Sequence, residues 1–458
     1  MMAAQLKLVR RADGSATEED IGSISLLDNT DGLDLDYMNG WTPAVASGMK
    51  PGPVIETMTL VSRGDDTDDL ASNRQALDDK LKEIEWYWDD PTERYGIWLR
   101  AQLKNETYAR QTLIRRANAQ WGGDSVYGPF VEDAYTDRAC TFGLERLPFW
   151  EDTGLTGHTS EITDPSFTGG TMDYGTVKGD VPARLYRLEV GDADTDIEEF
   201  WIGFRTARLG TIANLEPVWQ CDDGTTVSAD TSEETDYMET DFTASTDMET
   251  RFYVTMSDVT ANYSDQRGQF IVLLRAQCSD GTTTTRVRLL DGYATGAMRT
   301  QSRVVVDSAD WFLYPLGTVT IPPVKGDTAS SLVLKSMRLQ VEAERTAGTG
   351  SLRCDKFILI PYGEGAFYAD NVSITDSGHD CDIYYTCRGV LSGHTHTADT
   401  IINAVNPCVH NVYGAAVPVG AGTLIFAAQS ATAHVEASTA HVELYVYYRW
   451  RTLRGDDT

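Results

Sequence analysis

Lysine, and basic charge in general, is scarce in this sequence of 458 residues. There are 9 Lys and 29 Arg against 45 Asp and 24 Glu, which gives a formal net charge of −31. A surface of this sign repels phosphate backbones and anionic lipid headgroups. We therefore expect neither a nucleic-acid partner nor insertion into a membrane.

Long apolar runs and paired cysteines are also missing. No stretch reaches the ~18 uninterrupted apolar residues of a membrane-spanning helix. Residues 1–11 have no apolar segment after their charges, so we expect no cleaved leader. The 7 Cys residues are odd in number and form no Cys-x-x-Cys pair, which excludes a disulfide scaffold.

The motifs of several enzyme classes are absent as well. The sequence has no GxxxxGK[ST] phosphate loop, no GxGxxG after a strand, no HExxH and no GxSxG elbow. Its 69 carboxylates allow any acidic pairing, so such pairs carry no signal for a glycosidase. No catalytic residue and no cofactor is predicted, and we expect that the protein is not an enzyme.

What is present is typical of a globular protein built from several units. Hydrophobic residues make up 41% and charged residues 23% of the chain, and a prior of ~150 residues per domain suggests about three units. Most apolar residues recur with a period of two. The predicted fold class is mainly β: a multi-domain β-sandwich protein with one amphipathic helix in its N-terminal domain and an inserted antiparallel jelly-roll sandwich.

The helix is predicted over residues 67–90, within an N-terminal β-sandwich domain of residues 1–150. Leu70, Leu77, Leu81, Ile84 and Trp88 form one apolar stripe at helical spacing. Acidic residues crowd its start, where they complement the helix dipole. The sequence on either side alternates like strands.

The rest of the chain divides into three parts. Residues 151–210 are predicted as a crossing linker with strands, and 211–365 as a jelly roll of seven strands with no helix. The segment 221–249 carries ten acids and no Lys or Arg, which predicts a solvated loop or arm. Residues 366–458 form a C-terminal β region whose apolar last strand needs a sheet to join. The candidates are the N-terminal sheet and the linker sheet, and joining the N-terminal sheet would make residues 165–365 an insertion.

Metal ligands are one group of candidate site residues. Cys and His cluster near the C-terminus, in a spacing that matches no zinc module: Cys381, Cys387, His394, His396, Cys408 and His410. The alternative is polar loop histidines and buried thiols. A structural Ca²⁺ in an Asp-rich loop is a further possibility, with no ligand residue to name.

Aromatic residues in or beside the sandwich are a second group. Trp201, Trp219 and Trp311 are candidates for stacking on sugar rings. The alternative is that these indoles fill cores or pack on edge strands.

The N-terminal unit resembles the opening domain of the distal tail proteins of long-tailed viruses. The resemblance lies in the order of a β-rich start, a strand at 54–62, a helix after 65–69 and further strands, closed by Leu-Glu-Arg-Leu-Pro-Phe-Trp-Glu at 144–151. The heptapeptide Val-Lys-Gly-Asp-Val-Pro-Ala at 177–183 is similar to the entry into the next segment of related tail proteins. Residues 352–361 resemble the closing strand of carbohydrate-binding-type jelly rolls inserted in them.

This resemblance implies a structural virion protein, made in the host cytoplasm. Such proteins form a ring, six-fold in that family, that connects the tail tube to the tail tip or baseplate. Its outward sandwich domains would hold fibres or touch host-surface glycan. Ring closure joins unlike surfaces of neighbouring copies, and aromatic residues are enriched at interfaces. The candidates for this contact, with intramolecular core as the alternative, are Leu77, Leu81, Ile84, Trp88, Tyr445 and Tyr447.

Two other interpretations stay open. The first is another virion component, namely a receptor-binding, tail-tube or capsid-decorating protein. The second is a free carbohydrate-binding protein or a glycosidase. A trimeric spike with the jelly roll at its tip would indicate receptor binding, and a deep cleft with two carboxylates ~5–10 Å apart would indicate a glycosidase.

The excess of Asp over Glu and of Arg over Lys predicts a salt-adapted protein, as from a halophilic source; the alternative is an ordinary acidic surface that favours solubility. If it is salt-adapted, the melting temperature should rise steeply between low and molar salt. The rise must continue above 0.1 M, where the Debye length is already ~10 Å. Thermal melts followed by circular dichroism check this, and a flat curve would refute it.

Overall fold

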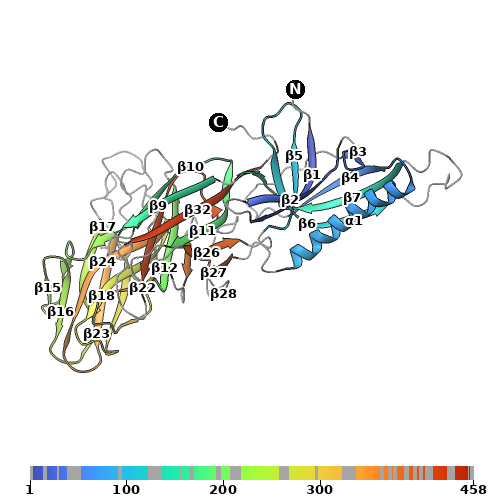
Figure 1. Ribbon diagram of the computed structural model, residues 1–458. Coiled ribbons are helices and arrows are strands. Elements are labelled where there is room, and N and C mark those ends of the chain that lie inside the picture. The colour runs from blue at the N-terminus through green and yellow to red at the C-terminus, as the bar shows by residue number, and fades with distance from the viewer. Residues whose placement is uncertain are drawn as a thin grey trace, which may run out of the picture.

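The computed structural model is elongated, with a helix-bearing unit at one end, a jelly roll at the other and a middle unit between them (Figure 1). The structure describes residues 4–13, 18–27, 30–38, 53–90, 95–121, 137–154, 156–163, 170–191, 197–206, 218–256, 268–293, 298–321, 337–361, 366–369, 374, 379–385, 391–395, 400–401, 406–407, 416–430, 439–451 and 453. The predicted fold class is confirmed: the protein is a multi-domain, mainly antiparallel β-sandwich protein, and α1 is the one helix of these ranges.

The N-terminal unit is a sandwich whose two sheets share strand β6. Its strands are β1 (Gln5–Asp13), β2 (Glu18–Ser25), β3 (Leu33–Met38), β4 (Val54–Arg63), β5 (Ile97–Gln102), β6 (Arg110–Trp121), β7 (Asp137–Arg146) and β8 (Trp150–Asp152). One sheet runs β2-β1-β5-β6-β8 and the other β3-β4-β7-β6. A register shift between Ile114 and Arg116 lets β6 pass from one sheet to the other. Leu8, Leu60, Leu99 and Leu144 belong to the core between them.

Helix α1 (Thr67–Asp89) covers this core. Asp66 caps its N-terminus, and its carboxylate accepts the amides of Asp68 and Asp69 at 2.9 Å. The predicted stripe is the buried face: Leu70, Leu77, Leu81 and Ile84 are all less than 9% exposed. The 3.6-residue period of the sequence therefore gave both the helix and the face it buries.

The middle unit is a second sandwich, built from two distant parts of the sequence. Its strands are β9 (Thr156–Thr163), β10 (Gly170–Val177), β11 (Val181–Gly191), β12 (Glu199–Thr206), β25 (Ala366–Ala369), β26 (His379–Tyr385), β27 (Leu391–Thr395), β28 (Thr400–Ile401), β29 (Asn406–Pro407), β30 (Ala416–Val417), β31 (Gly420–Gln429) and β32 (Thr439–Trp450). One sheet contains β9, β32, β11, β26, β27 and β28, and the other runs β10-β31-β12-β25-β29. The segment expected as a crossing linker thus contributes four strands, and the C-terminal region supplies their partners.

Strand β32 joins the middle unit to the N-terminal unit. It pairs with β9 over Thr439–Val446 and with β8 at Arg449 and Trp450, while β11 lies along its other edge. Because β8 also pairs with β6, one continuous sheet runs from the first unit into the second. The jelly roll enters and leaves between β12 and β25, so it is inserted into the middle unit.

The jelly roll is a sandwich of two antiparallel sheets. Its strands are β13 (Val218–Gln220), β14 (Thr225–Thr226), β15 (Thr231–Glu233), β16 (Met238–Phe242), β17 (Thr246–Met256), β18 (Gly268–Cys278), β19 (Thr285–Tyr293), β20 (Arg299–Thr300), β21 (Val304–Val306), β22 (Phe312–Ile321), β23 (Met337–Arg345) and β24 (Gly350–Pro361). One sheet runs β15-β16-β24-β18-β22 with β13 on β24, and the other β14-β17-β23-β19-β20 with β21 on β19. Phe270, Val272, Leu274 and Ala276 alternate along β18, so they share the face that fills the core.

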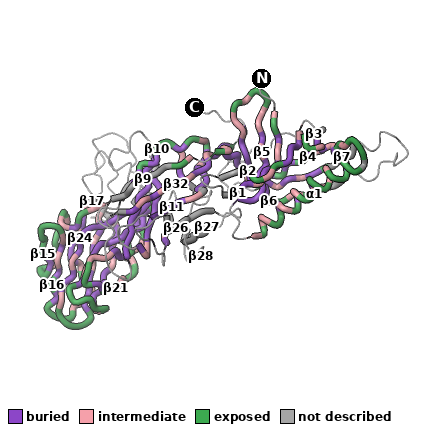
Figure 2. Tube along the Cα trace, in the orientation of Figure 1, coloured by how far each residue is buried: buried purple, intermediate pink, exposed green. Residues whose placement is uncertain are grey.

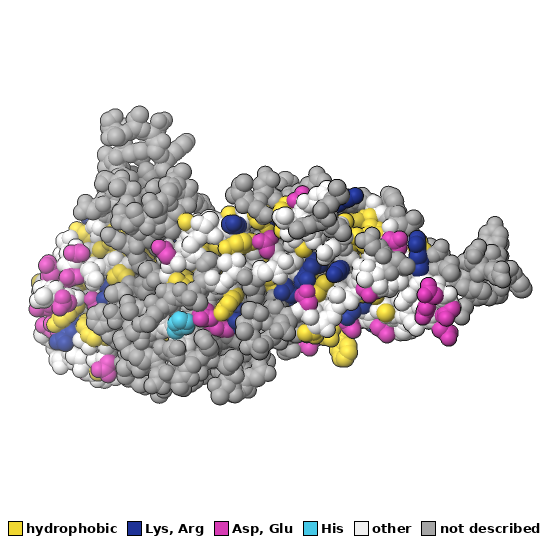
Figure 3. Space-filling view, turned by 45° about the horizontal axis from the view of Figure 1, so that its top comes forward, with side chains coloured by type: hydrophobic (Ala, Val, Ile, Leu, Met, Phe, Trp, Pro, Cys, Tyr) yellow, Lys and Arg dark blue, Asp and Glu magenta, His cyan; other side chains and the backbone are white. Residues whose placement is uncertain are grey.

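The acidic segment 221–249 is ordered and not a loop, which corrects the sequence prediction. It contains β14, β15, β16 and the start of β17. Cys221, Met238 and Phe242 in this segment are buried in the jelly-roll core, and most acids between them stay exposed. The count of acidic residues hid these short strands, because only every second residue of an edge strand must be apolar. Burial along the chain and the acidic side chains at the far end of the jelly roll are visible in Figures 2 and 3.

No helix in the described ranges is long and apolar enough to cross a membrane.

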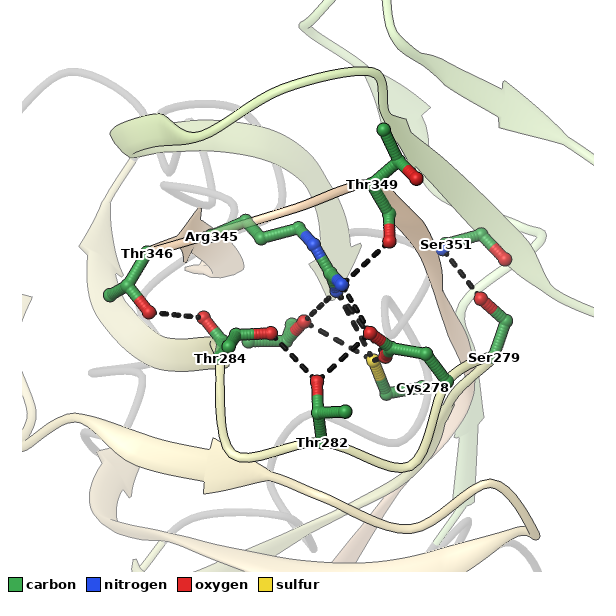
Figure 4. A network of polar contacts seen from close by, with 10 residues as sticks. Cys278, Ser279, Thr282, Thr284, Arg345, Thr346, Thr349 and Ser351 are labelled. Atoms are coloured by element: carbon green, nitrogen blue, oxygen red, sulfur yellow. Dashed lines mark hydrogen bonds and ion pairs between the residues drawn. The ribbon is translucent and has the colours of Figure 1, made fainter.

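A buried arginine ties together the loops at one end of the jelly roll (Figure 4). The guanidinium of Arg345, 2% exposed, forms an ion pair with Asp280, and it donates to Thr285 Oγ1 at 2.9 Å and to the Thr349 carbonyl at 2.6 Å. Cys278 Sγ lies 3.7 Å from the same guanidinium. The hydrogen bond from Arg345 holds the pKa of Asp280 well below its ordinary value.

This depressed pKa gives a pH-dependent stability. A lowered carboxyl pKa contributes stability above the unfolded value of ~3.9, and the contribution is lost as the pH falls through the folded value. We expect Asp280→Asn to lower the free energy of unfolding at neutral pH, and the difference from wild type to shrink below about pH 4. Urea titrations across this range measure it, with the exposed Asp223→Asn as control. A difference that stays constant into acid would contradict the assignment.

Candidate functional site

The junction between the N-terminal and middle units is a buried polar seam along β32. Arg449 Nε lies 2.7 Å from Glu151 Oε1, and the Glu151 side chain is 4% exposed. Trp450 Nε1 donates to Asp152 at 2.9 Å, and its indole lies 4.0 Å from the guanidinium carbon of Arg110. A buried charge is tolerated when it is paired and hydrogen-bonded, so these contacts specify where β8 meets β32.

The Gly-Asp pair at 179–180, part of the motif noted in the sequence, holds the end of β32. Gly179 has φ +121°, and a Cβ there would lie 2.3 Å from the Arg449 carbonyl oxygen, so only glycine allows this approach. The Asp180 amide donates to that carbonyl at 3.1 Å, and the Asp180 carboxylate accepts the Arg451 amide at 2.7 Å. The motif therefore anchors the last strand where the two units join.

Tyr447 and Tyr445, predicted as inter-subunit residues, contact groups of their own chain. Tyr447 is fully buried, accepts a hydrogen bond from Arg11 at 3.0 Å and lies 5.7 Å from the Trp98 ring. Tyr445 is half-buried beneath Arg187 and donates to Glu443 at 2.5 Å. Burial, together with this hydrogen bond, raises the pKa of Tyr445 to about 12. A role of these tyrosines between copies stays a prediction.

Helix α1 buries its stripe and exposes a residue outside it. Leu77, Leu81 and Ile84 pack into the N-terminal core, and Trp88 packs against a small cluster that includes Trp98 and Tyr447. Trp86 is 73% exposed and stacks on Tyr87, and the guanidinium carbon of Arg10 lies 3.8 Å from the centre of the Tyr87 ring. The sequence analysis considered only the apolar stripe and did not identify Trp86 as an exposed residue. Its position off the stripe is the signal that could have identified it.

Two further exposed apolar side chains lie in the same unit. Ile21 on β2 is 59% exposed and Ile55 on β4 is 66% exposed. Of the large exposed apolar residues in the described ranges, only Val227 lies elsewhere. The N-terminal unit is therefore the part of the molecule whose described surface is richest in groups suited to a protein contact.

The jelly roll is docked on the middle unit through an apolar contact. Half of the outer face of its β24-β18-β22 sheet packs against the middle sheet; the buried members of this cluster are Trp201, Ile271, Leu273, Leu313, Ile358, Ile360, Ile425 and Ala427. At the edge, Gly203 of β12 approaches Pro361 so closely that a Cβ would lie 2.6 Å from its ring. The domain is thus held at a fixed angle.

A buried glutamine fixes the register of this docking. Gln429 of β31 is 2% exposed. Its Oε1 accepts the Leu313 amide at 2.7 Å, and its Nε2 donates to the Leu313 carbonyl at 3.1 Å and to Glu199 at 2.9 Å. One side chain thereby pairs with the backbone of β22 as a neighbouring strand would.

The three tryptophans proposed for sugar stacking have different positions. Trp201 is buried in the docking contact and stacks on Tyr368 at 5.1 Å. Trp219 packs against the jelly-roll core. Trp311 is half-buried at the start of β22 and meets Tyr237 edge to face at 5.9 Å, with Arg275 4.6 Å from its ring centre.

The metal candidates lie mostly outside the described residues. Cys387, His396, Cys408 and His410 are among those not described. The backbone register of β26 and β27 sets Cys381 opposite Thr395 and His394 opposite Asp382, so the two candidates are not cross-strand partners. Within the described ranges no group of His, Cys, Asp or Glu is arranged to hold a metal ion. The same residues offer no ligand set for the Ca²⁺ ion considered in the sequence analysis.

No family model matches the chain, and no curated protein matches it. Among solved structures, the chain is similar to a xylan-binding module, CBM15, at 10% identity and a TM-score of 0.21, over 31% of this chain and 94% of the module. It is similar to SPP1 Dit, described as a paradigm of the hub adsorption apparatus in phages infecting Gram-positive hosts, at 9% identity and a TM-score of 0.23, over 77% of this chain and 99% of that one. A chain of infectious bursal disease virus, strain Gt, matches 65% of this chain and 81% of its own length at 9% identity and a TM-score of 0.19. Likenesses at this level carry no argument about function.

The docking contact makes a prediction about rigidity. Replacing Gln429 by Leu leaves the amide and carbonyl of Leu313 buried without their partner, and each such loss costs roughly 1–3 kcal/mol. We expect the variant to fold but to release the jelly roll from its fixed angle. Small-angle scattering should show a larger radius of gyration, and limited proteolysis should cut faster between the units. The exposed Gln75→Leu substitution serves as control; identical behaviour of both variants would contradict the role.

Proposed function

We propose that this chain is a structural virion protein of a viral tail, and that it catalyses no reaction. Its copies form a ring, six-fold as in the family that the N-terminal unit resembles, which connects the tail tube to the tail tip or baseplate. The partners are therefore further copies of this chain, tail-tube proteins and tail-tip proteins. The jelly roll projects outward for fibre attachment or host-surface contact.

The observation that carries this proposal is the rigid connection of three sandwiches. The sheet that contains β6, β8, β32 and β11 crosses from the N-terminal to the middle unit without a flexible linker. The jelly roll, inserted between β12 and β25, is locked by the apolar contact and by Gln429. A protein that transmits position through an assembly needs such fixed angles, whereas a tethered binding module would not.

The exposed end of α1 supports a contact between copies. An indole that is 73% exposed, on an otherwise polar and acidic helix face, loses unfavourable contact with water when another subunit covers it. Tryptophan is also the residue type most enriched among energetically dominant interface positions. In a ring this surface would meet a different surface of the next copy.

Sedimentation of the purified full chain, with images of any closed particle, tests the proposal. We expect concentration-dependent closed rings. Trp86→Ser should weaken self-association by at least ~30-fold, as expected for losing about 2 kcal/mol at a hot spot. Val227→Ser, which removes an exposed apolar side chain from the jelly roll, should leave it unchanged.

A chain that stays monomeric at every accessible concentration would overturn the ring. Equal behaviour of the two variants would remove Trp86 from the contact. A trimer with the jelly roll at its tip would favour the alternative of a receptor-binding virion protein.

A further inference from the structure

Strand β2 lies at the edge of its sheet, with backbone groups that point away from it. Within the described ranges, β1 is the one strand that pairs with β2. The Leu26 amide donates to the Leu6 carbonyl at 2.8 Å, and pairs along an antiparallel ladder alternate between hydrogen-bonded and non-hydrogen-bonded. Counted back from this pair, Ser25 and Ser23 fall in non-hydrogen-bonded positions opposite β1. Their amides and carbonyls therefore point toward the open edge.

One end of this edge is already covered by a side chain. The Asp31 carboxylate accepts the Ser25 amide at 2.6 Å, as the carbonyl of a neighbouring strand would. Gly32 has φ +68°, and a Cβ there would overlap the Asn73 side chain, so the turn can press against α1 only with glycine. The next outward groups along the edge are those of Ser23, which is exposed and has no partner for them among the described residues.

A cleft of about 950 Å³ lies between this edge and α1, and it is called the β2–α1 cleft below. Strand and helix run side by side in opposite directions, because Asn73 lies at the turn that binds Ser25, and Lys80 Nζ lies 3.8 Å from the position of a Cβ on Gly22. Residues 73–80 of a helix and residues 22–25 of a strand each advance about 10 Å. The two walls thus stay level, which is the geometry of peptide recognition by strand addition. The residues lining these two walls are Ser23, Ile24, Asp69, Asn73, Ala76 and Lys80.

The free charge in the β2–α1 cleft is acidic. Both basic side chains of its lining have partners in their own chain: Lys80 pairs with a carboxylate three residues further along α1 at 2.6 Å, and Arg63 with one on β3 at 3.5 Å. Asp65 and Asp69 line the cleft where α1 begins and are exposed. No Lys or Arg of the described residues forms an ion pair with either of them. The cleft therefore favours a cationic occupant.

The outer face of β2 offers an apolar contact beside the same edge. Ile21 precedes Ser23 by two residues and is 59% exposed, whereas Ile24 is buried in the core. Because alternate residues of a strand share a face, Ile21 and Ser23 lie on the side away from the core. A strand added at the edge would place every second side chain within reach of Ile21. Its other side chains would point toward α1 and the carboxylates there.

From this arrangement we propose that the β2–α1 cleft binds an extended segment of a different protein, which joins β2 as an antiparallel strand. In this segment apolar residues alternate with Lys or Arg, and the backbone of Ser23 forms the central pair of hydrogen bonds. The segment comes from another protein because basic residues are scarce in this chain, whose net charge is −31. The inference goes beyond the proposed function, since the contact depends neither on a ring nor on Trp86.

Fluorescence anisotropy of a labelled peptide titrated with the full chain tests the cleft. The probe is the blocked heptapeptide Lys-Val-Lys-Val-Lys-Val-Lys. Its matched control carries N-methyl groups on the three Val residues, which keep every side chain and charge but can no longer donate to β2. We expect saturable binding of the probe and at least ~10-fold weaker binding of the methylated peptide, because its backbone hydrogen bonds are lost.

Variants of the chain test the same contact from the other side. Ser23→Pro removes the outward amide without removing a bond to β1, and proline is tolerated on edge strands. It should weaken binding of the probe at least ~10-fold, while Ser23→Ala, which keeps the amide, should bind normally. Should Ser23→Pro fail to fold, Asp65→Asn combined with Asp69→Asn provides a second variant. It should weaken binding about 3-fold at low salt, and the exposed Asp223→Asn should not.

Equal affinity for the two peptides, or equal affinity of the Ser23→Pro and Ser23→Ala chains, would mean attraction by charge alone and would overturn the cleft. Weaker self-association of Ser23→Pro in sedimentation would also overturn it, because the occupant would then be a second copy. Trp86→Ser should keep full affinity for the probe. A monomeric chain that binds the probe disproves only the ring, and rings that do not bind it disprove only the cleft.

Discussion

The last strand, β32, gives one backbone edge to β8 and β9 and the other to β11. Because β8 continues the N-terminal sheet, these hydrogen bonds close a single sheet across two units that are separated in sequence. Every other arrangement depends on this closure. The middle core between the two sheets, the insertion of the jelly roll and its angle all presuppose that the chain end returns to the residues at 150–191.

The polar seam at this closure selects one register. Shifting a strand by one residue exchanges its buried and exposed faces, and here it would also separate Arg449 from Glu151 and Asp180 from the end of the strand. Buried ion pairs add little net stability but penalise alternatives in which one partner is left alone. Gln429 likewise selects one register between the middle unit and the jelly roll. Apolar contacts by themselves would allow the two sheets to slide past each other.

Contacts between distant parts of the chain take several forms in this structure. They are shared strands, cation–aromatic pairs and a glutamine that acts as a strand partner, while one indole at the far end stays exposed.

Local periodicity was enough to predict α1 with its buried face and the mainly β sandwich class, because these depend on the alternation of neighbours along the chain. It failed at 221–249, where acids on the exposed positions of short edge strands hid Met238 and Phe242. It also could not separate the buried Trp201 from the half-buried Trp219 and Trp311, since all three have apolar neighbours in the sequence. Only the tertiary structure decided that β32 joins two sheets, that Trp201 is buried in the docking contact and that Trp86 is exposed. Each of these depends on residues far away in sequence that pack there or fail to do so.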